Sequence, residues 1–116
     1  MADDRMVKSN RAWMVLVTAP GLKPARVIAR ALLTARLAAC VNLVPRLESH
    51  YWWQDKLETS AEVLLVIKTT RSLLEALASE VRRQHPYDTP EIVAWPIALG
   101  SRRYLEWLEG SVRADP

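Results

Sequence analysis

Two side chains that could bind a metal ion flank a short loop with a proline at each end. His85 and Glu91 are six residues apart, and Pro86 and Pro90 lie between them. Imidazole and carboxylate groups are ligands for Cu(II) and Zn(II), and the two prolines would restrict the loop that carries them. The same residues also fit a structural role, with His85 at a helix C-terminus and Glu91 at a solvated strand end. Both interpretations remain open at this stage.

The chain offers few residues for catalysis. Cys40 is the only cysteine and lies in the uncharged segment Leu37–Pro45, which is typical of a small buried residue. A nucleophilic role would need a paired histidine, and nothing in the sequence places His50 or His85 beside it. A glycine-rich phosphate loop and the G-x-S-x-G, C-x-x-C and H-E-x-x-H motifs are absent. We therefore expect a binding protein and not an enzyme.

The bulk composition is typical of one globular domain. The chain has 116 residues, of which 50% are hydrophobic and 25% charged, enough for one core without disulfides. Its formal charge of +3 comes from scattered residues and requires no nucleic-acid partner. No apolar stretch is long enough for a bilayer, and a single cysteine suits a reducing compartment. We expect a cytoplasmic protein that requires no cofactor and has no nucleic-acid or membrane partner.

The elements that must position these side chains alternate between strand and helix patterns. Apolar, β-branched strand patterns occupy four segments, residues 12–18, 40–53, 57–69 and 91–96. Amphipathic helical patterns occupy three segments, residues 24–38, 72–85 and 101–109. Pro45 predicts an irregularity in the second strand, and residues 54–56 predict a hairpin turn. Ser72 and Glu75 have the spacing of a capping box at the start of the second helix.

The order of these elements predicts an α+β fold, a ferredoxin-like β-α-β-β-α-β sandwich with a C-terminal helix. Right-handed crossovers place the first and third strands at the centre of the sheet and the other two at its edges. Helices would cover one face, and the apolar second face is too large for a monomer, so we expect a closed homo-oligomer. The domain should span residues 12–112, between a flexible N-terminal tail at 1–11 and a C-terminal tail at 113–116.

Several segments occur together in an order that resembles one family. They are Val17–Pro20, Arg36–Pro45, Ser49–Trp53, Lys56–Glu58, Glu62–Thr69, His85–Glu91 and Tyr104–Trp107. In this order they resemble the CutA family of divalent-cation tolerance proteins, from about Trp13 to Val112. The resemblance implies a homotrimer built like the PII signalling proteins, a link to copper and other divalent metals, and a cytoplasmic location in bacteria.

One position departs from the family in a way that bears on the metal hypothesis. Some members carry a cysteine just before the threonine-alanine-proline segment, considered a copper ligand beside the histidine and glutamate. This chain has Val17 there. A thiolate would be the strongest ligand for a soft metal. With only His85 and Glu91 remaining, the resemblance implies at most weak binding of Cu(II) or Zn(II).

The PII-like build also implies clefts between subunits, which in that class hold small anionic molecules. We expect five residues to line such a cleft: Tyr51, Trp53, Lys68, Asp88 and Tyr104. Alternation along a strand puts Tyr51 and Trp53 on one face, and Lys68 could contact an anion. These aromatics could instead serve subunit packing, and Lys68 could be an exposed edge residue.

Two functions therefore remain open. One is a divalent-cation tolerance trimer that binds metal weakly, and the other is a small-ligand sensor or scaffold trimer with no metal role. An aromatic sheet could also stack RNA bases, but the aromatics of this chain do not follow the RNP pattern.

Overall fold

The computed structural model describes residues 3–114, which contain one large and one small antiparallel sheet. The large sheet consists of β2 (Ala12–Ala19), β3 (Cys40–Trp53), β4 (Lys56–Thr70) and β5 (Ile92–Pro96). The helices are α1 (Leu22–Thr34), α2 (Leu74–Gln84), which follows the 3-10 turn η1 (Arg71–Leu73), and α3 (Arg102–Ser111). The small sheet pairs β1 (Met6–Lys8) with β6 (Leu99–Ser101).

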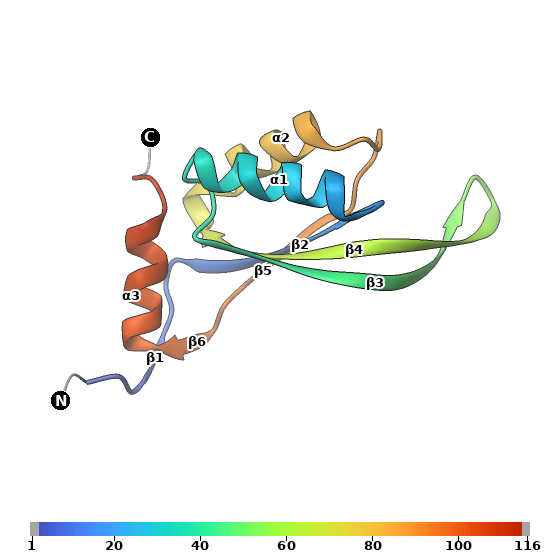
Figure 1. Cartoon of the computed structure of the whole chain (residues 1–116). Coiled ribbons are helices and arrows are strands. Elements are labelled where there is room, and N and C mark those ends of the chain that lie inside the picture. Colours follow the sequence, from blue (N-terminus) through green and yellow to red (C-terminus); the bar gives the residue numbers. More distant parts are fainter. Residues whose placement is uncertain (1–2, 115–116) are drawn as a thin grey trace.

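The strand order of the large sheet is β3-β4-β2-β5, so the first and third strong strand patterns of the sequence lie at its centre. Helices α1 and α2 lie together over one face, and α3 stands at one end of the sheet (Figure 1). This arrangement confirms the ferredoxin-like α+β fold with a C-terminal helix. It also confirms that the second and fourth strand patterns, β3 and β5, are edges.

Alternation along the strands sorts the apolar residues onto two faces. Val15, Val17, Leu65 and Ile67 point toward α1 and α2 and are fully buried in the core. The residues between them point the other way and are aligned across the strands by the register. We call this surface the open face, and it consists of Met14, Leu16, Val44, Leu64, Val66, Val93 and Trp95.

Strands β3 and β4 form a hairpin that extends well past the helices (Figure 1). Its turn consists of Gln54 and Asp55, both with positive φ (50° and 63°), which suits the twist of a two-residue hairpin connection. Between Val44 and Leu47 the register shifts, and Arg46 adopts a φ of 65°. This bulge lies next to Pro45, as the sequence predicts.

The end of the first helix differs from the sequence prediction. Helix α1 ends at Thr34, not Ala38, because Arg36 adopts a left-handed φ of 57°. The N–H groups of Arg36 and Leu37 donate to the carbonyls of Leu33 and Leu32, which is the Schellman pattern that terminates a helix. Apolar periodicity continued past this point in the sequence and gave no sign of it.

Two further predictions need correction. Residues 6–8 fall in the segment predicted as a flexible tail, but they form β1, which pairs with β6. The sequence predicts Ser72 as the N-cap of the second helix, but η1 occupies Arg71–Leu73 and the N-cap of α2 is Leu73, which makes no side-chain cap bond. Residues 1–2 and 115–116 of the two predicted tails lie outside the described residues.

Candidate functional site

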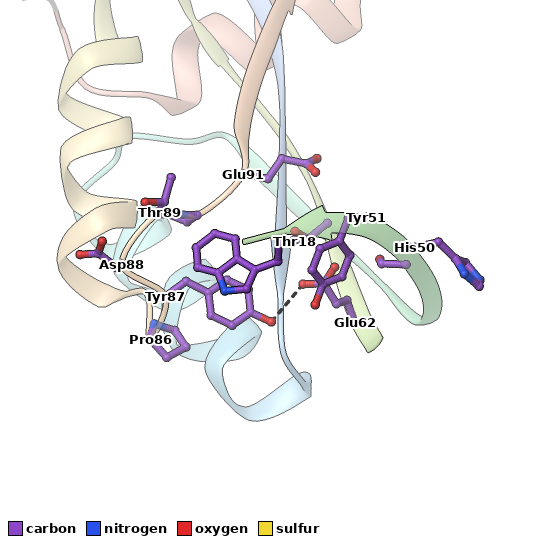
Figure 2. A pocket seen from close by; sticks show the side chains of 12 residues that line it. Thr18, His50, Tyr51, Glu62, Pro86, Tyr87, Asp88, Thr89 and Glu91 are labelled. Atoms are coloured by element: carbon purple, nitrogen blue, oxygen red, sulfur yellow. Dashed lines mark hydrogen bonds between the residues drawn. The ribbon is translucent and has the colours of Figure 1, made fainter. Parts of the chain in front are cut away.

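A cleft of about 810 Å³ lies between the β3–β4 hairpin and the loop that joins α2 to β5 (Figure 2). Its walls come from β2, from the outer half of the hairpin and from the whole proline-bounded loop. The lining residues are Thr18, Ser49, His50, Tyr51, Trp53, Glu62 and residues 86–91. Rigid strands therefore form one side of the cleft and a loop anchored by two prolines forms the other.

His85 fixes this loop from behind the cleft. The residue is buried, and its Nε2 donates a hydrogen bond to the carbonyl oxygen of Thr18 over 2.7 Å. Its Nδ1 accepts a hydrogen bond from the backbone N–H of Tyr87 over 3.0 Å. These partners assign the neutral tautomer with the proton on Nε2. Both ring nitrogens are therefore occupied by backbone groups.

Tyr87 ties the loop to the sheet on the other side of the cleft. Its hydroxyl donates a hydrogen bond to Oε2 of Glu62 over 3.1 Å (Figure 2). Burial raises the pKa of Tyr87 to about 12, and the negative charge of Glu62 adds to the effect. Tyr87 thus stays protonated at neutral pH and acts as a hydrogen-bond donor to a carboxylate.

The two residues expected to bind metal are differently placed. Glu91 lines the cleft, whereas His85 lies behind its wall. Within residues 3–114, no three His, Cys, Asp or Glu side chains come together as a metal site. Val17, at the position of the family's cysteine, is fully buried in the core. The residues as arranged do not fit a resident metal, because ligation by His85 would first require one of its hydrogen bonds to break.

The five residues expected to line one cleft fall into two groups. Tyr51, Trp53 and Asp88 line the cleft described above. Lys68 and Tyr104 instead meet near α3, where the Lys68 ammonium lies 5.7 Å from the centre of the Tyr104 ring. Lys68 also donates a hydrogen bond to Oδ1 of Asn42 over 3.3 Å. Within one chain, the expected cation is therefore not part of the cleft.

Sequence reasoning missed two residues that organise the cleft, Glu62 and Tyr87. A usable signal for Glu62 was its position two residues before the half-buried Leu64, on the same side of β4. A carboxylate that continues an apolar stripe is a candidate for a specific interaction. Tyr87 gave no comparable signal, because its partner lies 25 residues away in the sequence.

Comparison with known proteins places this chain in a family. The model of the CutA1 divalent ion tolerance protein matches residues 13–111. The chain belongs to the CutA1 divalent ion tolerance family. This finding confirms the resemblance seen in the sequence motifs.

Named relatives include bacterial and plant proteins. The divalent-cation tolerance protein CutA of Thermus thermophilus is 52% identical over 95 residues, which are 82% of this chain and 92% of the relative. The chloroplastic protein CutA 1 of Oryza sativa is 49% identical over 100 residues, 86% of this chain and 56% of the relative. The chain thus spans little more than half the length of this plant protein.

Solved structures of the family share the fold. The crystal structure of CutA1 from Oryza sativa matches with a TM-score of 0.88 at 47% identity, covering 90% of this chain and 96% of that one. The structure of CutA1 from Thermus thermophilus matches with a TM-score of 0.86 at 48% identity, covering 88% of this chain and 99% of that one. Among the helices of residues 3–114, none combines the length and apolar character of a membrane span.

Proposed function

We propose that this chain acts in divalent-cation tolerance as a homotrimeric binding module that binds Cu(II) or Zn(II) weakly and holds no resident metal. The observation that carries the proposal is the open face of the sheet. Val93 and Trp95 on this face are 49% and 45% exposed in a single chain. An apolar face of this kind favours burial against another subunit.

The hairpin provides a second set of surfaces that favours self-association. Trp52 and Leu57 are cross-strand partners near its tip, and Trp52 is 70% exposed. The hairpin also carries the edge strand β3, whose outer backbone groups can pair with another strand. Closed rotational symmetry would satisfy every copy of these surfaces, and the family's PII-like build favours three copies.

One residue of the cleft and one residue behind it support the proposal that metal binding is weak. Glu91 offers an accessible carboxylate, whereas His85 would have to give up one of its two hydrogen bonds before its imidazole could ligate a metal. This rearrangement opposes binding, and two protein ligands leave most of the coordination shell to water. We further propose the cytoplasm as the site of action, since Cys40 is a free thiol, and cell fractionation would test this location.

The proposal is tested by calorimetry with Cu(II) and Zn(II) on protein whose mass has been measured by analytical ultracentrifugation. We expect three times the chain mass, and weak metal binding that His85→Ala and Glu91→Gln each reduce. Arg83→Gln, an exposed change on α2, serves as the control. A monomeric mass contradicts the module, and tight binding, or binding that both variants leave unchanged, contradicts the metal role.

A second candidate function, small-ligand sensing, is favoured by one observation. The cleft has the volume of a small-molecule site, and aromatic side chains and carboxylates line it together. Small-ligand sensing needs no metal. A calorimetry experiment that finds no binding of Cu(II) or Zn(II) would therefore not contradict this second function.

A further inference from the structure

We infer that the cleft between the hairpin and the loop at residues 86–91 binds a small organic cation, an alkylguanidinium or alkylammonium ion, with Glu62 as its anionic anchor. The inference rests on the second candidate function, that the cleft is a ligand site, and names the class of its ligand. It replaces the anion expected from the PII-like build with an ion of the opposite charge.

The first argument is the sign of the charge in the cleft. Three carboxylates line it, those of Glu62, Asp88 and Glu91, and its lining contains no Lys or Arg. Lys68, the cation expected here, lies against Tyr104 and Asn42 instead. Low-dielectric walls concentrate the field of such carboxylates, so the cleft attracts cations and repels anions.

The second argument is the burial of Glu62 without a countercharge. The residue is only 8% exposed, and its Oε2 accepts the hydrogen bond from Tyr87. Among the ion pairs of residues 3–114, none joins Glu62 to a Lys or Arg. Removing a carboxylate from water is costly unless a cation or several donors replace the water. A ligand that carries N–H donors on a positive charge would supply both.

The third argument is the aromatic lining. Tyr51, Trp53 and Tyr87 line the same cleft as Glu62. The faces of such rings attract ammonium and guanidinium groups, most strongly where water is excluded. Tyr51 is held by a hydrogen bond between its hydroxyl and Ser60 over 3.1 Å. The aromatic rings would thus contact the charged group and its alkyl chain while Glu62 accepts hydrogen bonds from it.

The loop is organised before any ligand arrives. The hydrogen bond from His85 to Thr18 and that from Tyr87 to Glu62 tie the beginning of the loop to β2 and β4. A wall held in place in advance lowers the ordering cost of binding. Metal ligation by His85 would loosen this wall, so metal and organic cation should compete, although they use different atoms.

The test is calorimetric titration of the full chain with n-butylguanidinium, with butyrate and n-butanol as isosteric anionic and neutral controls. We expect saturable binding of one butylguanidinium per chain, and we expect no binding of butyrate or n-butanol. Glu62→Gln keeps an acceptor for Tyr87 but removes the charge, and should weaken binding about tenfold or more. Glu58→Gln makes the same change on the same strand outside the cleft and should leave the affinity unchanged.

Three outcomes overturn the inference. They are no binding of butylguanidinium, binding of butyrate as tight as that of the cation, and an affinity that Glu62→Gln does not change. The mass of each sample is measured in parallel, which separates this failure from failure of the homotrimer. If butylguanidinium does not bind and Glu62→Gln also dissociates the trimer, a second copy of the chain supplies the countercharge of Glu62.

Discussion

The two faces of the large sheet carry similar residues but have different surroundings. On one face, Val15, Leu65 and Ile67 are fully buried in the core beneath α1 and α2. On the other, Val93 and Trp95 remain about half exposed in a single chain. Burial of apolar area stabilises only where a second surface is present. The helix-covered face therefore holds the chain together, and the open face is available to hold chains to one another.

The same contrast separates the cleft from the core. The core contains a buried polar group that is satisfied within the chain, the Thr69 hydroxyl, which donates to the carbonyl of Leu37 over 2.6 Å. In the cleft, Glu62 is buried beside aromatic rings, and no Lys or Arg of residues 3–114 forms an ion pair with it. Buried charges are ordinarily paired, so the missing countercharge of Glu62 supports the inference that the cleft takes a cationic ligand.

The largest effect should come from the helix-covered face. Leu65→Ala leaves a cavity beneath the helices and should lower the free energy of unfolding by about 2–5 kcal/mol, measured by urea denaturation. Val66→Ala, the next residue and on the open face, should cost clearly less at protein concentrations where the chain is monomeric. Equal losses for the two variants would break the distinction between the faces.

The next effect should appear in assembly. Trp52→Arg places a charge at the exposed hairpin tip and should convert the proposed trimer to a monomer without unfolding the chain, measured by sedimentation. Leu33→Arg makes a similar change at an exposed position of α1 and should leave the trimer intact. A trimer that tolerates Trp52→Arg would remove the hairpin tip from the interface.

A smaller effect concerns the pH dependence of the cleft. Because the pKa of Tyr87 is raised to about 12 in the folded state, its contribution to stability is complete below pH 10 and is lost as pH rises through 12. Absorbance at 295 nm should show one of the three tyrosines ionising at about pH 12. Tyr87→Phe should remove that step, and a step that persists in the variant would belong to another tyrosine.

The smallest effect should come from the outer surface of the helix layer. Hydrogen bonds from Gln84 and Arg83 lower the pKa of Glu80 below its usual value of 4.5. The contribution of these hydrogen bonds to the free energy of unfolding is complete above pH 4.5, and it is lost at lower pH as Glu80 becomes protonated. Glu80→Gln should therefore reduce the free energy of unfolding at pH 7 by less than about 1 kcal/mol, and by still less at pH 3. A loss that grows at low pH would contradict this assignment.

The sequence predicted the fold well because the patterns that define it are local. Period-two strands, amphipathic helices, the irregularity at Pro45 and the helix end at His85 all follow from residues close together in the chain. The errors arose where the structure depends on backbone conformation or on pairing between distant strands. The left-handed turn at Arg36 and the pairing of β1 with β6 leave no periodic signal.

The candidate site was less predictable for the same reason. Spacing puts Glu91 and Asp88 in one loop, and alternation puts Tyr51 and Trp53 on one strand face; all four residues line the cleft of the single chain. Lys68 lies on the same side of β4 as Glu62, since they are six residues apart. Only the length of the strand, about 3.4 Å for each residue, puts the lysine near α3 and the glutamate in the cleft.

The sequence by itself determined the order of the elements, the composition of both sheet faces and the family of the chain. These properties depend on local propensity, period and motif, which neighbouring residues fix. The tertiary structure alone decided that both nitrogens of His85 are occupied, that Tyr87 meets Glu62, and that the cleft is acidic. The physical reason is that hydrogen bonds and charge fields depend on distance in space, and residues 18, 62 and 85 become neighbours only when the sheet forms.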